Sequence, residues 1–158
     1  MKIRHIRESD YDRIVPLIND WWAGRQMADM VPRLFFAHFQ LTSFIADEDG
    51  EILGFLIGFL SPARTNEAYI HFVGVDPNHR QKSIGKHLYE HFFYTVQQEK
   101  RSIVRAVTSP VNETSIAYHV KMGFSIEPGE EENGIHIHKN YDGPGQDRVR
   151  FVKELDLI

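Results

Sequence analysis

Three strong cations gather around one short turn in the middle of the chain, within "NHRQKSIGKHL" (78–88). The turn follows the apolar run "YIHFVGV" and precedes a segment with the apolar spacing of a helix. Its central residues are Arg80, Gln81, Lys82, Ser83, Ile84, Gly85 and Lys86. A strand that turns directly into a helix presents free backbone N–H groups and the positive end of the helix dipole. The sequence therefore predicts a phosphate-binding turn, and a solvated turn with incidental basic residues is the alternative.

Composition narrows the chemistry that this turn serves. The net charge of −4 disfavours non-specific binding to nucleic acid, which depends on broad positive potential. The chain has no cysteine, which excludes disulfides, thiolate metal sites and a cysteine nucleophile. No apolar run approaches the roughly 18 residues that cross a membrane, and the first residues lack the apolar core of a secretory signal. We therefore expect a cytoplasmic protein in which the basic turn has a local purpose.

Hydrophobic periodicity and breaker residues predict the elements that must position the turn. Strands are predicted at 2–7, 43–60 (a hairpin around Asp49-Gly50), 67–75, 102–109, 124–127 and 148–155. Helices are predicted at 9–22, 30–40, 84–99 and 112–122, and a polar loop without a clear period covers 128–147. Early hairpins, followed by strands that alternate with helices, predict an α/β fold with a mixed sheet and helices on both faces. Without linkers or repeats, residues 1–158 are expected to form a single domain.

Two motifs on these elements resemble a known family. Arg80-x-x-Ser83-x-Gly85 after "VGVDP" resembles the Arg/Gln-x-x-Gly-x-Gly/Ala signature of the GNAT superfamily of acyl-CoA-dependent N-acetyltransferases. The segment "NETSIAYHVKMGF" (112–124) resembles the family's helix, which has asparagine, then tyrosine seven residues later, then Gly-Phe. The order of the elements agrees over nearly the whole chain. The resemblance implies a single-domain, GNAT-like fold and acetyl-CoA as the cofactor.

The resemblance also assigns cofactor-binding residues. It implies that residues 80–86 hold the pyrophosphate of coenzyme A and that the helix begun by Asn112 flanks the pantetheine. It further implies a strand splay near Gly74, so that the pantetheine pairs with a free edge at Val73, Gly74 and Val75. A glycine inside a strand is typical of a bulge or of a close backbone approach. A simple packing glycine is the alternative.

Two positions depart from the family pattern. Ser83 stands where the family usually has its first glycine; it still offers an N–H group, while its Cβ could narrow the phosphate cradle. His119 stands where the family usually has tyrosine, and Tyr118 is its neighbour, about 100° round the helix. The second departure leaves two candidates for the general acid.

The implied reaction moves an acetyl group from acetyl-CoA to a primary amine of a small molecule or peptide, by direct attack through a tetrahedral intermediate. It needs a neutral amine and a proton for the departing thiolate. His71, which alternation places on one face with the valines of the free edge, is the predicted base, and Glu67 is the second candidate. His119 is the predicted acid. The alternatives are a half-buried structural histidine for His71, and for His119 a packing role in which Tyr118 or water delivers the proton.

The resemblance implies that the first two helices and the late loop shape the acceptor site, and acceptor recognition is predicted in "NDWWAGRQMADMVPR" (19–33). Trp21 and Trp22 could supply an aromatic wall, and Arg25 and Arg33 a cation that binds a carboxylate. The alternative is that Trp21 belongs to the core and the arginines to the surface. The sequence does not identify the acceptor.

No metal site is predicted. His87 and His91 have a metal-compatible spacing but lack the acid-base pattern of a zincin. The "HIH" at 136–138 is read as a strand with alternating polar positions, and the alternative is that it ligates a metal or lines a substrate mouth with Asp142. A catalytically silent acyl-CoA-binding module is the alternative function, motivated by Ser83 and by the missing tyrosine. Neither nucleic acid nor a membrane is expected as a partner, and a homodimer is left open.

Overall fold

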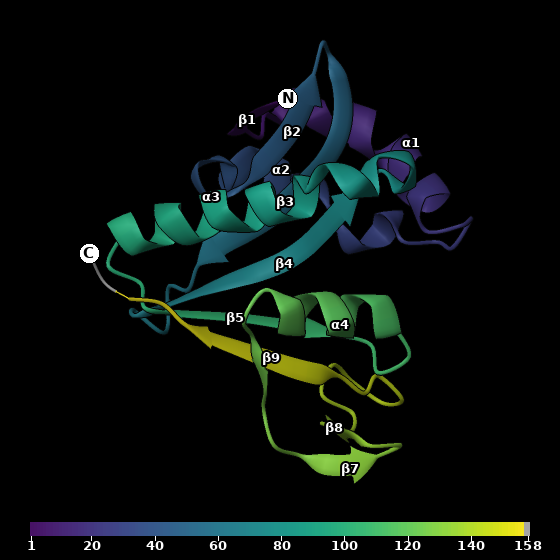
Figure 1. Ribbon diagram of the computed structural model, residues 1–158, viewed down its shortest axis with the longest axis vertical. Coiled ribbons are helices and arrows are strands. Elements are labelled where there is room, and N and C mark those ends of the chain that lie inside the picture. Colours follow the sequence, from purple (N-terminus) through teal and green to yellow (C-terminus); the bar gives the residue numbers. More distant parts are fainter. Residues whose placement is uncertain (157–158) are drawn as a thin grey trace.

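The computed structural model describes residues 1–156. The strands are β1 (Lys2–His5), β2 (Phe44–Glu48), β3 (Glu51–Leu60), β4 (Glu67–Val75), β5 (Ile103–Thr108), β6 (Ser125–Ile126), β7 (Glu130–Glu132), β8 (Ile135–Ile137) and β9 (Val149–Glu154). The α-helices are α1 (Tyr11–Trp21), α2 (Arg33–His38), α3 (Ile84–Gln98) and α4 (Glu113–Lys121) (Figure 1). Short 3₁₀ segments are η1 (Glu8–Asp10), η2 (Ala28–Met30), η3 (Gln40–Thr42) and η4 (Pro77–Lys82). Within the described residues, no helix combines the length and apolarity needed to cross a membrane.

Seven strands of the described chain form one sheet, in the order β1-β2-β3-β4-β5-β9-β6. Neighbouring strands are antiparallel except β4 and β5, which run parallel. β9 returns from the C-terminal part of the chain to lie between β5 and β6, so the helix that links β5 to β6 does not join sheet neighbours. The mixed sheet confirms the predicted fold class.

Apolar side chains cover both faces of the sheet. α3 and α4 lie over one face (the α3/α4 face), and α1 and α2 lie over the other (the α1/α2 face) (Figure 1). The predicted stripe of α3 is fully buried against the sheet and consists of Ile84, Leu88, Phe92 and Val96. Burying each such side chain contributes about 1.5–3 kcal/mol. The helical spacing of these residues therefore decides which way α3 lies on the sheet.

β4 and β5 pair over only part of their length. Glu67 to Tyr69 of β4 lie opposite Ile103 to Arg105 of β5, and the strands then diverge. Figure 1 shows the two ribbons meeting at one end and separating toward the other. We call the separated parts, residues 70–75 of β4 and 106–108 of β5, the splay. The predicted splay is thus confirmed, and it opens several residues before Gly74.

A bulge in β4 lies at His71 and not at the glycine three residues later. The register pairs Ile57 with Phe72 and Gly58 with Ile70, which leaves His71 without a partner in β3. One extra residue in a strand places two consecutive side chains on the same side. The bulge therefore shifts the alternation of β4 earlier than the sequence predicted.

The bulge changes which residues share a face. His71 stacks on Phe35 of α2, and its neighbour Phe72 packs into the same α1/α2 layer. Val73 and Val75 pack into the opposite, α3/α4 layer. The prediction that His71 shares a face with these valines is wrong, because the extra residue reverses the phase between them.

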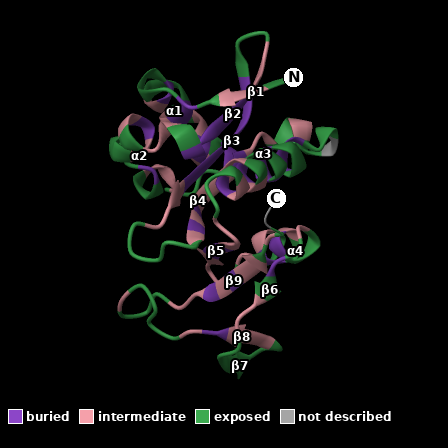
Figure 2. Cartoon of the chain, turned by 90° about the vertical axis from the view of Figure 1, so that its left-hand side faces the viewer, coloured by how far each residue is buried: buried purple, intermediate pink, exposed green. Residues whose placement is uncertain are grey.

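The segment predicted as a loop at 128–147 contains a two-stranded hairpin, β7–β8. Its turn is Asn133-Gly134, with φ values of 53° and 82°. An Asn-Gly pair at positive φ is the strongest short hairpin signal. Figure 2 shows β7 as an exposed element at the periphery of the chain. The prediction of a loop is therefore wrong at the hairpin, while the strand read at 136–138 corresponds to β8 within one residue.

Candidate active site

The basic turn (residues 78–86) begins as the 3₁₀ segment η4, which contains Gln81, and leads into α3. Asp76 caps it, because one carboxylate oxygen accepts a hydrogen bond from the Asn78 N–H at 2.9 Å. Ser83 joins the two helices with a φ of 56°, in the left-handed region that favours glycine. Ser83 makes no side-chain cap, so the N–H groups of the first turn of α3 stay open to an anion.

Two of the three cations of the basic turn have an acidic partner. Lys82 Nζ lies 3.5 Å from Glu48, and Lys86 Nζ lies 4.0 Å from Glu90. Both pairs are exposed and therefore weak. Arg80 is exposed, with no carboxylate at ion-pair distance among residues 1–156. The turn thus combines open N–H groups with an uncommitted guanidinium, which is a set that binds phosphate.

Tyr118 reaches from α4 to the first turn of α3. A Cβ on Gly85 would lie 2.7 Å from the Tyr118 hydroxyl oxygen, so glycine is required for this approach. The Tyr118 ring meets that of Tyr89 edge-on, with centroids 5.4 Å apart. Burial, and then the charge of Glu90, raise the pKa of Tyr118 above its ordinary 10.0. Tyr118 therefore presents a protonated hydroxyl between the basic turn and α4.

His119 points into the core. It is 8% exposed, and its ring stacks on Phe151 with centroids 4.4 Å apart. Nδ1 donates to the Ser115 carbonyl at 2.8 Å, so Nε2 accepts from the Tyr89 hydroxyl at 3.2 Å. Burial lowers the pKa of His119 below its ordinary 6.5. Both ring nitrogens of His119 are therefore bonded to core residues, and neither is directed into the splay.

The strand edge at 73–75 lies in the splay and has no pairing with β5. Its other edge pairs with β3. A Cβ on Gly74 would lie 2.6 Å from Phe55 and 2.9 Å from Trp22. Gly74 therefore has the packing role that was the alternative to a bulge at this position. Asn112 caps α4 by accepting a hydrogen bond from a backbone N–H at 3.1 Å, which leaves its NH₂ group to donate elsewhere.

His71 lies on the α1/α2 face beside the splay. Its Nε2 donates to the Met30 carbonyl at 2.5 Å, and its ring stacks on Phe35 with centroids 4.3 Å apart. Burial lowers the pKa of His71 below its ordinary 6.5. Because Nε2 carries the proton, Nδ1 is the nitrogen that can accept one.

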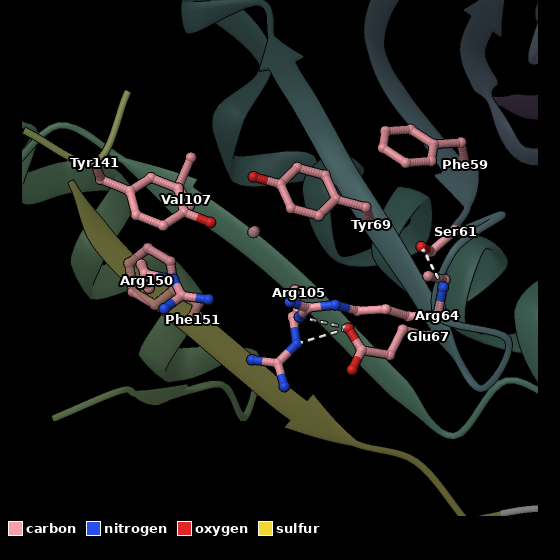
Figure 3. Close-up of a pocket in the computed structure, with 12 residues that line it drawn as sticks. Phe59, Ser61, Arg64, Glu67, Tyr69, Arg105, Val107, Tyr141, Arg150 and Phe151 are labelled. Atoms are coloured by element: carbon pink, nitrogen blue, oxygen red, sulfur yellow. Dashed lines mark hydrogen bonds and ion pairs between the residues drawn. The ribbon is translucent and has the colours of Figure 1, made fainter. Parts of the chain in front are cut away.

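A cavity of about 240 Å³ opens where β4 and β5 begin to part (Figure 3). Its walls come from β3, β4, β5, β9 and the connections beside them: Phe59, Ser61, Arg64, Glu67, Ala68, Tyr69, Arg105, Ala106, Val107, Tyr141, Arg150 and Phe151. Glu67, Tyr69 and Arg105 alternate with core residues that face α3, so their side chains lie on the α1/α2 face. Of this lining, the sequence identified Glu67 alone.

Ion pairs organise the charged wall of this cavity. Glu67 Oε1 accepts a hydrogen bond from Arg105 Nε at 2.8 Å and lies 3.6 Å from Arg64. Arg105 also pairs with Glu127, whose other oxygen lies 3.2 Å from Arg150. Glu67 is therefore bound to arginines and not free to act alone. Arg105 is the one charged residue in the strand "IVRAVT", and this was a signal that could have indicated the site.

The two predicted tryptophans have different surroundings. Trp21 is 8% exposed and stacks on Phe55. It belongs to the core, which was the alternative to a role in the acceptor site. Trp22 is half-buried, lies 5.1 Å from Phe72 between ring centroids, and borders Gly74. Trp22 is therefore the one of the pair that lies beside the splay, on the α1/α2 face.

The two predicted arginines lie at the surface. Arg33 lies over the Tyr11 ring at 4.3 Å and pairs with Glu8 at 3.7 Å and Asp12 at 3.5 Å. Arg25 is exposed in the turn after α1. Neither arginine lines the cavity described above. The structure does not bring them together with Glu67 and His71.

One group of metal-ligating side chains lies next to the basic turn. The ligand atoms of Glu51, Asp76 and His79 lie within 4.8 Å of one another. Asp76 already caps the turn, and His79 Nδ1 lies 3.3 Å from its carboxylate. Asp76 and His79 therefore help to fix the turn, and the absence of a metal cofactor stays a prediction.

A model of the acetyltransferase (GNAT) family matches residues 7–124, which is well over half of the 158 residues. This chain belongs to the GNAT acetyltransferase family. The match includes the basic turn and α4, and it confirms the resemblance drawn from them. β7, β8 and β9 lie outside the matched residues of this GNAT protein.

The GNAT chain is 30% identical over 74 residues to the L-2,4-diaminobutyric acid acetyltransferase of Virgibacillus pantothenticus. That alignment covers 47% of this chain and 46% of the relative, so the match spans about half the length of the curated relative.

Solved structures of other acetyltransferases share the GNAT fold of this chain. One is the diaminobutyrate acetyltransferase of Paenibacillus lautus in complex with L-2,4-diaminobutyric acid and coenzyme A, with a TM-score of 0.72, 20% identity and coverage of 99% and 95% of the two chains. Another is an acetyltransferase of Salmonella typhimurium with acetyl-CoA, with a TM-score of 0.70, 19% identity and coverage of 99% and 94%.

Proposed function

We propose that this GNAT protein transfers the acetyl group of acetyl-CoA to a primary amine of a small molecule or peptide. The observation that carries the proposal is the placement of two sites on opposite faces of one splay. The basic turn and α4 flank the splay on the α3/α4 face, and the cavity of about 240 Å³ opens on the α1/α2 face. A donor and an acceptor that enter from opposite faces meet between β4 and β5, which provides the proximity that acyl transfer needs.

The residues of the donor face fit coenzyme A. The open N–H groups of α3, with Arg80, Lys82 and Lys86, would hold the pyrophosphate. The edge at 73–75 would pair with the amides of pantetheine as an added strand does, and the NH₂ of Asn112 would donate to the same arm. When bound, acetyl-CoA supplies an acyl thioester at the splay.

Tyr118 is the proposed proton donor to the departing sulfur. It comes from α4, which lies on the donor face of the splay, and burial raises its pKa, so it stays protonated near neutral pH. His71 is the proposed base, acting through Nδ1 directly or through water, with Glu67 as the second candidate. His119 is left out of the proposal because both of its nitrogens are bonded in the core.

The acceptor is proposed to be a small amine. The cavity of about 240 Å³ is smaller than the pockets of about 300–1,000 Å³ that enclose drug-sized ligands. Two proteins similar to this chain are named for acetylating diaminobutyrate, which is a small primary amine. L-2,4-Diaminobutyric acid is therefore the first acceptor to test.

The proposal is tested with two measurements on the purified protein. Calorimetry with coenzyme A compares the wild type with Arg80→Glu, and Lys139→Glu, which makes the same charge change in the β8–β9 connection, is the control. Arg80→Glu should weaken binding at least tenfold, or about 1.4 kcal/mol, and the control should not. A thiol-release assay with acetyl-CoA and an amine panel then measures turnover. Unchanged affinity in Arg80→Glu, with the fold intact, contradicts the placement of the pyrophosphate.

A catalytically silent acyl-CoA-binding module is the second candidate. The burial of His119, at the position where the family usually has its tyrosine, is the observation that favours it. Tight coenzyme A binding without thiol release on any amine supports the module. Thiol release that depends on an added amine supports the transferase.

A further inference from the structure

The cavity on the α1/α2 face carries more positive than negative charge. Arg64, Arg105 and Arg150 line it, and the carboxylates that pair with them belong to Glu67 and Glu127. This set leaves one formal positive charge beside the cavity. A simple alkyl amine, with a pKa of about 10.4, is a cation in water and is repelled there. Charge balance therefore favours an acceptor that carries one negative charge of its own.

Arg64 and Arg150 both have donors to spare in this wall, and Arg150 is the more enclosed of the two, with a side chain 23% exposed against 60% for Arg64. One terminal nitrogen of Arg150 lies 3.2 Å from Glu127, and its guanidinium lies over the Tyr141 ring at 4.7 Å. Its remaining N–H donors have no hydrogen-bond partner among residues 1–156, whereas Arg105 is held by two carboxylates. A stacked guanidinium that is fixed on one side is pre-organised to bind a carboxylate on the other.

Two tyrosine hydroxyls lie in the same cavity. Tyr69 comes from β4 and Tyr141 from the connection between β8 and β9, and Figure 3 shows their hydroxyl ends directed toward each other. Neither hydroxyl has a hydrogen-bond partner in the part of the chain that the structure describes. Burial raises the pKa of Tyr69 to about 12, so it remains a neutral donor at physiological pH. Both hydroxyls can donate to an anion beside Arg150.

Arg150 lies at the level where the splay opens. Arg105 is the last residue of β5 that pairs with β4. Val107 is the next residue of β5 on the same face, and it lies opposite Arg150 of β9. Neighbouring strands are about 4.8 Å apart. An anion held at Arg150 thus lies within about one or two strand spacings of the splay, where the amine must react.

We propose that the acceptor is a small primary amine that also carries a carboxylate, and that Arg150, Tyr69 and Tyr141 bind this carboxylate. The proposal deepens the proposed acetyltransferase function and rests on it. A carboxylate matches the single excess positive charge, which a doubly charged phosphate exceeds. The sequence predicted Arg25 and Arg33 as the cations that bind a carboxylate, and the proposal assigns this role to Arg150.

Matched amines test the proposal directly. L-Lysine is compared with 1,5-diaminopentane and L-lysinamide, and L-ornithine with 1,4-diaminobutane, so that the members of each set differ at the carboxylate. KM and kcat are measured with acetyl-CoA, and binding to the protein saturated with coenzyme A is measured by ligand-observed NMR. The members with a carboxylate should have a KM and a dissociation constant at least tenfold lower.

Variants locate the carboxylate site. Arg150→Gln should raise KM for the carboxylate members at least tenfold and change kcat less, and it should lower KM for the decarboxylated amines because it removes the excess positive charge, while Arg150→Lys should retain part of the preference. Tyr141→Phe removes a hydroxyl that no described residue uses and should raise the same KM about threefold without loss of stability. Arg33→Gln is the matched comparison, because Arg33 also lies over a tyrosine ring but outside the cavity.

The outcomes separate the two proposals. Equal binding of amines with and without the carboxylate, or an unchanged preference in both Arg150→Gln and Tyr141→Phe, overturns the carboxylate site. Loss of the preference in Arg33→Gln alone also overturns it and moves recognition to α2. A carboxylate preference in binding that persists without acetylation of any amine supports the site and contradicts the proposed transferase.

Discussion

Tyr118 and His119 are neighbours on α4 with opposite surroundings. The Tyr118 hydroxyl lies against the first turn of α3, next to the basic turn, while His119 stacks on Phe151 and bonds to Tyr89 and Ser115. The sequence pattern points to position 119 for the acid, because the family tyrosine aligns there. The proposal of Tyr118 as the acid therefore rests on the surroundings of the two side chains and not on the alignment.

Phenylalanine substitutions separate the roles of these neighbours. Tyr118→Phe should lower kcat about 100-fold and leave stability nearly unchanged, because it removes a proton donor that the core does not use. His119→Phe should retain kcat but lower the free energy of unfolding by about 1–3 kcal/mol, because the buried Tyr89 hydroxyl loses its acceptor. Steady-state kinetics and urea unfolding measure both effects. A large loss of kcat in His119→Phe alone returns the acid role to His119.

The buried histidines make stability depend on pH. Burial lowers the folded-state pKa of His119 and of His71 below 6.5, so below that pH the unfolded chain binds more protons than the folded chain. Their contribution to stability is therefore complete above about pH 6.5 and is lost as the pH falls toward the folded-state pKa. Urea unfolding at about pH 7.5 and about pH 5.5 should show a smaller loss on acidification in His119→Phe than in the wild type. Equal losses in the two proteins contradict this account.

At the scale of elements, the junction between η4 and α3 stores strain at one residue. Ser83 has a φ of 56° and no capping bond from its side chain. Ser83→Gly should raise the free energy of unfolding by about 0.5–1 kcal/mol and keep or improve coenzyme A affinity. Ser83→Ala is the matched control, because it keeps the strain and removes only the hydroxyl. If both variants weaken binding by about 0.5–1.5 kcal/mol, the hydroxyl holds a phosphate oxygen and the departure is an adaptation.

The sequence predicts those elements whose own pattern decides their burial. The stripe of α3 and the Asp49-Gly50 hairpin are local signals, and both are present in the structure. The bulge at His71 depends on the register with β3, which periodicity within β4 does not encode. The Asn133-Gly134 turn was a local signal that the polar composition around it concealed.

The candidate site shows the same division. The basic turn could be found from its residues, because a strand, a turn and a helix are contiguous in the chain. The acceptor cavity could not, because Arg105, Tyr141 and Arg150 come from separate segments that the fold brings together. Arg33, which was a candidate from the sequence, forms its ion pairs with Glu8 and Asp12 at the surface, in agreement with the alternative given for it.

At the scale of the whole molecule, the sheet separates two environments and the splay connects them. The α3/α4 face presents the basic turn, and the α1/α2 face presents the charged cavity. The splay runs from the end of the β4–β5 pairing, beside the cavity, to the end of β4, after which the basic turn follows. The proposed function therefore places the donor and the acceptor on different faces of the sheet and has them react in the splay.

The most direct test follows the acetyl group itself. Acetyl-CoA labelled with ¹³C at its carbonyl is mixed with the protein and L-2,4-diaminobutyric acid, and ¹³C NMR follows the carbonyl signal. The account predicts that the thioester signal is replaced by the amide signal of the acetylated amine, at a rate that Tyr118→Phe lowers about 100-fold. Label that stays in the thioester, or that appears only as free acetate, with this amine and with every other amine tested would contradict the account.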